Sequence, residues 1–364
     1  MSKSTARELQ VIQPGPMTLI QDRGRSGYQQ LGVSVSGAVD VDALDIGNRL
    51  VGNDLNAAGL EVMLGGLVVR FSEATAFALT GADTSATIDG VPVANYVSYM
   101  AHTGAELQMG MAINGLRAYL AAAGGVGTPL ILESRSTHIA SAIGGTEGRA
   151  LVEGDVLRLG EVNGDNISGR LLNAESQTND GNGLDVRVVL GPQDNEFSTA
   201  GIETLLSSSY SVTDQSNRQG LRLDGPVIES KSGRYDIISD AVVNGSIQVP
   251  GDGKPIILLA DRQTTGGYAK IATVATVDLP KLGQATPGTT VSFLAISVED
   301  AQALLAERQR IIIESDLPKI VDPTTVTVDG IDVAVGVAEN GVSMLAEVDG
   351  NIYPISVDEY TPAE

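Results

Sequence analysis

Glycine interrupts the apolar segments of this chain so often that long helices are disfavoured. The 364 residues include 43 glycines, and short apolar runs such as residues 67–71 and 116–122 alternate with turns of Gly, Asp and Asn. Trp and Cys are absent and 4% of the residues are aromatic, so the core must rest on Val, Ile, Leu and Ala. Because β-branched residues favour strands and Gly favours turns, the sequence predicts a mainly β fold with a few short helices.

The chain divides at a polar stretch rich in Gly and Asn. Residues 161–184 include NGDNISGR and ESQTNDGNG, which hold too few apolar side chains to pack, and we predict a linker there. The flanking parts, residues 8–160 and 185–315, are each long enough for one domain. In residues 316–364, apolar and polar residues alternate around two Asp-Gly pairs, which predicts a β-rich C-terminal extension with two hairpins.

Three helices are expected. Asp40 or Asp42 can cap one that ends near Leu50, because Gly and Asn follow at the next positions. A second is predicted near residues 196–206. The third runs from 298 to about 310, where Ser297 and Asp300 have the spacing of a capping box.

The densest polar segment connects two apolar runs, residues 256–260 and 273–277, and reads as strand, turn and strand. Its Gly-Gly pair exposes backbone N–H groups to a ligand, and its two cations suit a carboxylate or a phosphate. An ordinary hairpin loop would use the same residue types. The polar residues between the strands are Asp261, Arg262, Gln263, Thr264, Thr265, Gly266, Gly267, Tyr268 and Lys270.

Residues 216–226 offer a second set of binding groups. Arg218 can hold a carboxylate with two parallel N–H donors, Asn217 can donate and accept hydrogen bonds, and Asp224 can orient the arginine or take a proton. A salt-bridge network that braces a strand end is the alternative interpretation. Residues 22–29 carry two arginines as well, which suit either an anion or Arg–Asp pairs that tie down a loop.

Charge and composition exclude several functions. With 23 basic and 45 acidic side chains the formal charge is −22, which makes nucleic acid and anionic membranes poor partners. Without cysteine, and with only His102 and His138 as imidazoles, no metal site is expected. The N-terminus lacks an apolar run of signal-peptide length, so a cytoplasmic location is expected. No phosphate-binding GxxxxGK(S/T) loop occurs, which indicates a subunit that relies on a partner for any use of ATP.

Several segments together resemble a known family. The match rests on QDRGRSGYQQLGVSVSGAVD, LTGAD, AYLAAAGGV, SRST, GPQDNEF, SNRQGLRLDGP and GSIQVPGDGKPIILLADRQTTGGYAKIATV, in this order between residues 9 and 315. These segments are similar to the biotin-dependent carboxyltransferase-like family named for subunit 2 of allophanate hydrolase, which includes the C subunit of prokaryotic 5-oxoprolinase. The resemblance implies two cyclophilin-like β-barrel domains.

The resemblance also implies a subunit that is active only in a complex. The expected partners are a B subunit, similar to allophanate hydrolase subunit 1, and an A subunit, a lactam hydrolase. The complex would use ATP to hydrolyse 5-oxoproline to glutamate. The lack of a biotin-carrier segment favours this function. One alternative is a carboxyltransferase subunit that moves a carboxyl group from carboxybiotin to urea or another amide. The other is a non-catalytic regulator that binds a kinase inhibitor.

Both substrates present an unreactive amide, and its activation requires N–H groups and cations around an oxygen that gains negative charge. The expected catalytic residues are Asp224, Asp261 and Lys270, with either aspartate as the base. The expected substrate-binding residues are Asn217, Arg218, Gln248, Arg262, Thr265, Gly266, Gly267 and Tyr268.

Overall fold

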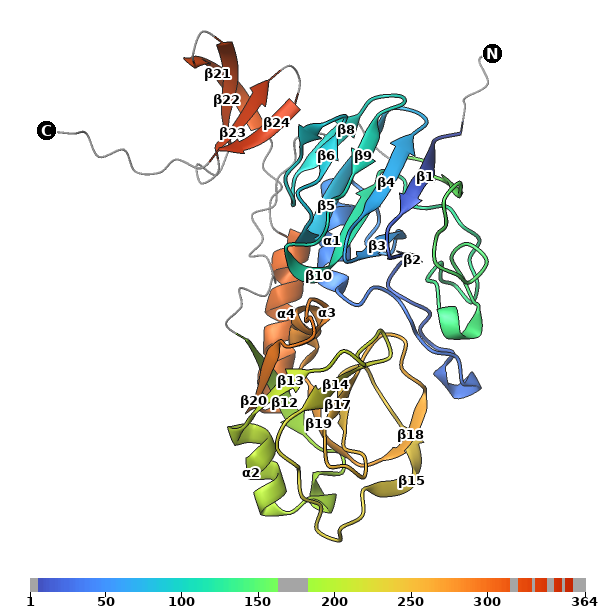
Figure 1. Ribbon diagram of the computed structural model, residues 1–364, viewed down its shortest axis with the longest axis vertical. Helices are drawn as coiled ribbons and strands as arrows, with labels where there is room; N and C mark the ends of the chain where they lie inside the picture. The colour runs from blue at the N-terminus through green and yellow to red at the C-terminus, as the bar shows by residue number, and fades with distance from the viewer. Residues whose placement is uncertain are drawn as a thin grey trace, which may run out of the picture.

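The computed structural model describes residues 6–162 and 183–314, together with four strands of the C-terminal segment. Two bodies built mainly of strands lie one above the other, the first in blue to green and the second in yellow to orange (Figure 1). The predicted mainly β fold is confirmed. Most of the predicted linker, residues 163–182, lies outside the described residues. Within the described part of the chain, no helix is long and apolar enough to cross a membrane.

The first half consists of two antiparallel sheets around one apolar core. The six-stranded sheet has the order β11-β1-β4-β9-β6-β7 and the five-stranded sheet β2-β3-β10-β5-β8. Its strands are β1 (Glu8–Pro14), β2 (Met17–Gln21), β3 (Gly59–Met63), β4 (Leu67–Phe71), β5 (Thr75–Asp83), β6 (Thr87–Ile88), β7 (Val91–Pro92), β8 (Ser98–Ala101), β9 (Glu106–Gln108), β10 (Asn114–Ala122) and β11 (Val156–Arg158). Leu9, Phe71, Phe77 and Leu120 are among the side chains buried in this core.

The two halves differ in how their sheets close. In the first half the two sheets remain separate, where we predicted a barrel. Residues 127–155 contain a Gly-rich series of turns and the short 3-10 helix η2 (Ile139–Ser141), and they add no strand to either sheet. The first half therefore consists of two open sheets that share one core.

The second half is a closed barrel, as predicted, with the strand order β12-β19-β16-β17-β14-β13-β20. Parallel pairing of β12 with β20 closes the ring. The strands are β12 (Leu184–Leu190), β13 (Ser209–Val212), β14 (Gly220–Asp224), β16 (Ser246–Gln248), β17 (Ile256–Leu258), β19 (Lys270–Val274) and β20 (Thr290–Ala295). A separate two-stranded ribbon joins β15 (Asp236–Ala241) to β18 (Thr265–Tyr268). The barrel interior holds Val186, Leu221, Ile247 and Ile257.

All three predicted helices are present. In α1 (Val41–Leu50) the Asp40 side chain accepts a hydrogen bond from Ala43 N, and Ser198 caps α2 (Thr199–Ser207). In α4 (Val298–Glu314) the Ser297 Oγ accepts from Asp300 N at 3.0 Å. The sequence did not predict the short α3 (Leu279–Gly283) or the 3-10 helices η1 (Gln29–Leu31), η3 (Asp194–Glu196) and η4 (Thr276–Asp278).

The C-terminal extension has the predicted β structure. Its four strands, β21 (Ile320–Val328), β22 (Ile331–Ala338), β23 (Met344–Val348) and β24 (Asn351–Ile355), form one antiparallel sheet. β21 pairs with β22 and β23 with β24, and the two Asp-Gly pairs predicted to form the hairpin turns lie outside the described residues.

The polar segment after β17 differs from the prediction. β17 and β19 are not neighbours, because β16 lies between them in the barrel, and the supposed turn contains its own strand, β18. β19 also begins at Lys270, three residues before the predicted start. The Lys270 side chain is 2% exposed, and an ion pair with Asp240 at 2.9 Å allows this cation to lie in a buried strand.

Candidate functional site

A small cavity lies on the outer face of the barrel. Leu221, Ile247 and Ile257 point into the core, so the strand alternation turns their neighbours Arg222 and Gln248 outward. The β18 segment and the loop after β13 wall the cavity, whose volume of about 200 Å³ suits a small molecule. Pockets that bind drug-sized ligands have volumes of roughly 300–1,000 Å³, so this cavity suits a smaller molecule. The lining residues are Gln215, Asn217, Gln219, Gly220, Arg222, Gln248, Ile256, Leu258, Gln263, Gly266, Gly267 and Tyr268.

Carboxamide side chains form a hydrogen-bonded series across this cavity. Gln219 Nε2 donates to Gln263 Oε1 at 3.2 Å, and Gln263 Nε2 approaches Gln248 Oε1 at 3.5 Å. Gln248 Nε2 in turn donates to the carbonyl oxygen of Tyr268 at 3.4 Å. Asn217 Oδ1 accepts from Gln219 N at 2.8 Å, which fixes the loop. Carboxamides both donate and accept, so this lining matches the donor and acceptor of an amide ligand.

Gly266 is required by the position of Gln248. A Cβ atom at residue 266 would lie 2.3 Å from Gln248 Nε2, whereas one at Gly267 would have its nearest neighbour at 3.7 Å. A side chain at 266 would therefore have to displace the Gln248 carboxamide from its present position. Both glycines lie on β18, and the pairing of Gly266 with Asp240 of β15 holds the ribbon in place.

Lys270 and Asp240 brace this ribbon from behind. Asp240 Oδ2 accepts from Lys270 Nζ at 2.9 Å and from Gln193 Nε2 at 3.1 Å, and Gln193 Oε1 accepts from Lys270 N. The hydrogen bond from Lys270 lowers the pKa of the Asp240 carboxyl. Asp240 lies opposite Gly266 in the β15–β18 pairing. The ion pair thus fixes the wall that carries Gly266 and Gly267.

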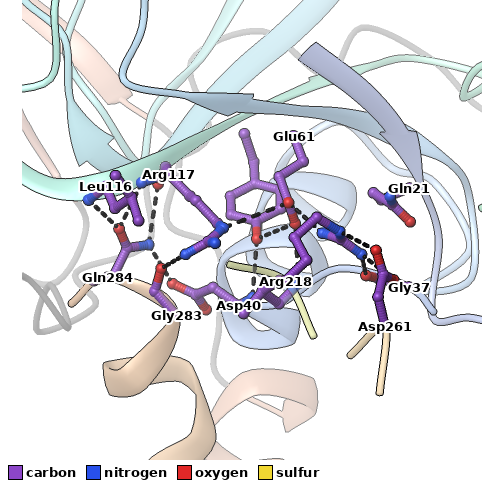
Figure 2. A network of polar contacts seen from close by, with 12 residues as sticks. Gln21, Gly37, Asp40, Glu61, Leu116, Arg117, Arg218, Asp261, Gly283 and Gln284 are labelled. Atoms are coloured by element: carbon purple, nitrogen blue, oxygen red, sulfur yellow. Dashed lines mark hydrogen bonds and ion pairs between the residues drawn. The ribbon is translucent and has the colours of Figure 1, made fainter. Parts of the chain in front are cut away.

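Arg218 and Asp261 belong to a buried network at the junction of the two halves (Figure 2). Arg218 donates to Asp261 Oδ2 from Nε at 2.8 Å, to Gly37 O from Nη2 at 2.6 Å, and to Glu61 of β3 from Nη1. Arg117 of β10 lies 3.5 Å from the same Glu61 oxygen. Burial acts to lower the pKa of Arg218, but the charges of Glu61 and Asp261 outweigh burial and raise it. These side chains brace the two halves against each other.

The network continues to the start of α1. Tyr119 donates to Glu61 Oε2 at 2.8 Å and accepts from Asp40 N at 2.9 Å. Gln284 of the second half donates to Asp40 Oδ2 at 2.7 Å and accepts from Arg117 N at 3.0 Å. Burial, with the nearby charge of Asp42, raises the pKa of Asp40 to about 7.

The structure brings together only part of the predicted site. Asn217, Gln248, Gly266, Gly267 and Tyr268 line one cavity, and Thr265 begins the strand that walls it. The other predicted residues, Arg218, Asp224, Asp261, Arg262 and Lys270, are not among the cavity-lining residues.

Asp224 and Arg262 contact other groups away from the cavity. Asp224 pairs with Lys254 on the surface, and this hydrogen bond lowers the pKa of Asp224. Arg262 is buried, which lowers the pKa of its guanidinium, and its Nη1 approaches the carbonyl oxygen of Leu259 at 3.4 Å.

Four lining residues with polar side chains were not predicted as site residues: Gln215, Gln219, Arg222 and Gln263. Arg222 could have been predicted from the sequence. It stands between Leu221 and Leu223, and the alternation of a strand then turns it outward, to the same face as Gly220. Gln219 and Gln263 lie in the two polar segments that the sequence singled out, but the sequence does not show that the fold brings these loops together with Gln215.

The arginine-rich loop at residues 22–29 is tied to the rest of the first half. Arg23 Nε donates to Asp45 Oδ1 at 2.9 Å. Asp22 accepts from the hydroxyl of Ser134 at 2.7 Å and from Arg135 N at 2.6 Å. These contacts match the loop-tying alternative. Over the described residues, no group of three or more His, Cys, Asp or Glu side chains that could hold a metal is found.

Comparison with known proteins identifies the family. The family model described as carboxyltransferase domain, subdomain A and B, matches residues 31–295. The C subunit of 5-oxoprolinase from Escherichia coli (strain K12) is 38% identical over 302 residues, which cover 83% of this chain and 96% of that protein. The urea amidolyase of Saccharomyces cerevisiae is 33% identical over 326 residues, 84% of this chain but 18% of that protein. This chain belongs to the carboxyltransferase domain family, subdomains A and B.

A solved structure supports the same fold. The Kluyveromyces lactis urea carboxylase matches with a TM-score of 0.78 and 27% identity, over 95% of this chain and 34% of that chain. The chain thus spans almost the whole length of the bacterial relative but about a third or less of the yeast urea enzymes.

Proposed function

We propose that this chain is the C subunit of an ATP-dependent 5-oxoprolinase and that the carboxamide-lined cavity binds the lactam. The observation that carries the proposal is the cavity itself, a small site whose walls offer paired amide donors and acceptors. The match over 96% of the Escherichia coli relative supports it, because that protein is named for this reaction.

In this proposal the cavity binds and orients the amide. Gln248 and Asn217 hydrogen-bond the lactam N–H and C=O, and a backbone N–H group of the Gly266-Gly267 pair stabilises the negative charge that forms on the carbonyl oxygen when a nucleophile adds to it, before the ring C–N bond breaks. Lys270 acts by positioning, since its ion pair with Asp240 holds the glycine strand. Asp261 acts by fixing Arg218 beneath the loop that carries Asn217.

The proposal assigns proton transfer to a partner protein. Of the described residues that line the cavity, none is a carboxylate or an imidazole. Asp224, a predicted base, is held by Lys254 at the surface, and Asp261 is held by Arg218. A site that binds an amide but lacks a base is incomplete, which is consistent with a catalytic site shared with the B or the A subunit.

Neither the turn at residues 251–254 nor the carboxamide-lined cavity suits ATP. Residues 251–254 form a turn that leads into β17, and no helix N-terminus follows it to receive phosphates. The cavity on the barrel is also smaller than a nucleotide requires. We therefore assign ATP use to the partner subunits.

The second candidate is a carboxyltransferase subunit that acts on urea. The urea amidolyase match covers 84% of this chain, and the urea carboxylase structure covers 95%. An amide-lined cavity would hold urea as well. In that case biotin on a separate carrier would deliver the carboxyl group.

Substrate-dependent ATP turnover by the complex purified on this chain from its native host tests both candidates. Turnover stimulated by 5-oxoproline, insensitive to avidin and accompanied by glutamate, is the expected result. Turnover stimulated by urea and abolished by avidin would establish the carboxyltransferase instead. If neither amide stimulates turnover, the catalytic proposals fail and the regulatory alternative takes their place.

A further inference from the structure

Arg222 is the one charged side chain among the described residues that line the cavity. It lies on the outer face of β14, where its exposed side chain follows from the alternation with buried Leu221 and Leu223. Its backbone is fixed, since Arg222 N donates to Ser216 Oγ at 3.0 Å and its O accepts from Thr213 N at 2.9 Å. The cation is thus held at the cavity by its strand.

The guanidinium of Arg222 differs from the cations of Arg218 and Lys270 in having no counterion among the described residues. Arg218 is neutralised by Glu61 and Asp261, and Lys270 by Asp240. Among the described residues, no ion pair or side-chain hydrogen bond involves the Arg222 guanidinium. Asp224, two residues along the same face, is already paired with Lys254. An unpaired arginine beside a cavity is suited to bind a ligand carboxylate through two parallel hydrogen bonds.

The strand register places this cation opposite the amide-binding groups. Arg222 pairs with Ile256 of β17, and Ile256 pairs with Gln248 of β16. The three residues therefore form a row across adjacent strands, with Arg222 and Gln248 roughly 10 Å apart at their Cα atoms. Both side chains can reach a small molecule that lies over Ile256, one from each end.

We propose that Arg222 binds the carboxylate of the substrate and so selects an anionic lactam over neutral amides such as urea. This inference rests on the proposed function and specifies its substrate class. The anionic end lies against Arg222, and the lactam lies against Gln248 and the two glycines. Because the whole chain carries a formal charge of −22, a local unpaired cation is needed to hold an anion here.

The test measures equilibrium binding of two ligands, 5-oxoproline and its uncharged amide, 5-oxoprolinamide, to the purified complex. We expect Arg222→Gln to raise the Kd of 5-oxoproline about 10- to 100-fold, the range of one charge-assisted contact, and to leave the Kd of the amide within about twofold. Arg222→Lys should recover part of the loss. Arg234→Gln is the matched control, because Arg234 is exposed on the same half and outside the cavity lining.

Other outcomes would overturn the inference. An unchanged Kd for 5-oxoproline, or an equal loss for both ligands, would show that Arg222 does not recognise charge. Inorganic phosphate provides a further check. If it binds the wild type without competing with either ligand, and this binding disappears in Arg222→Gln, then Arg222 binds a phosphoryl group instead of the substrate carboxylate. A turnover assay distinguishes failure of this inference from failure of the proposed function. If the complex binds 5-oxoproline through Arg222 but shows no 5-oxoproline-dependent ATP hydrolysis, the inference about Arg222 holds and the proposed activity fails.

Discussion

At the scale of single residues, Gly266 controls the cavity most directly. Gly266→Ala would place a Cβ atom 2.3 Å from Gln248 Nε2 and must displace that carboxamide. We expect kcat/KM for 5-oxoproline to fall by about tenfold or more, the value of one lost hydrogen bond to the reacting amide, with the melting temperature lowered by a few degrees. Steady-state kinetics of the complex measure this. Gly251→Ala is the control, because its Cβ would meet no atom within 4 Å, and equal kinetics for the two variants would contradict the role of Gln248.

Asp40 predicts a pH dependence of stability. Burial raises its pKa from 3.8 to about 7, so the folded state holds this proton more tightly than the unfolded chain. The stabilisation is complete below about pH 4 and is lost as the pH rises toward 7. Between pH 5 and 8 we therefore expect the free energy of unfolding of the wild type to fall, relative to Asp40→Asn, by on the order of a few kcal/mol. Urea denaturation across this range measures it, and parallel curves for the two proteins would refute it.

Single residues also show how far sequence reasoning reaches. Gly266 and Gly267 were predicted from local turn chemistry and Gln248 from the family resemblance, and all three line the cavity. Arg218 was identified as a carboxylate clamp, and it does hold two carboxylates, but one of them is Glu61, which is 157 positions away. No local pattern identifies such a partner, so a binding site and an internal brace could not be told apart in the sequence.

At the scale of elements, the three capped helices α1, α2 and α4 were predictable and the strand order was not. Caps such as Asp40 and Ser297 mark helix starts within a few residues. Strand neighbours depend on long-range pairing, and the β15–β18 ribbon pairs two segments that the sequence gives no reason to connect. The cavity exists because this ribbon covers the outer face of the barrel.

The α4 helix allows a test at this scale, because it contacts β12 and η4 of the second half and α1 of the first. Ser297 caps it, and Arg308 near its end pairs with Asp42 at 2.8 Å. We expect Ser297→Ala to lower the free energy of unfolding by about 1 kcal/mol, whereas Ser297→Thr, which keeps the hydroxyl, changes it by less than half of that. Chemical denaturation compares the variants, and equal losses for both would exclude a capping effect.

At the scale of the whole molecule, the two halves meet through buried charge. Arg218 and Asp261 come from the second half, and Glu61, Arg117 and Gly37 come from the first (Figure 2). Such a network makes the relative position of the halves specific, because each group loses its partner if they shift. It also connects the cavity to the first half, since Arg218 follows Asn217 directly.

Arg218→Met should therefore uncouple the halves. It leaves the Asp261 carboxylate without its counterion and leaves Glu61 with Arg117 alone, and breaking a buried ion pair in this way typically costs about 3–5 kcal/mol. We expect urea unfolding, followed by circular dichroism, to begin at lower denaturant and to separate into two steps. Adding Glu61→Gln and Asp261→Asn should recover part of the lost free energy of unfolding, because the uncompensated buried charges are then removed.

Arg70→Met is the matched control: the exposed Arg70–Glu106 pair, at 3.0 Å, should contribute less than about 1 kcal/mol. An Arg218→Met protein that unfolds like the control would mean that the network does not hold the halves together, and that Arg218 is free to act on a ligand as the sequence first indicated.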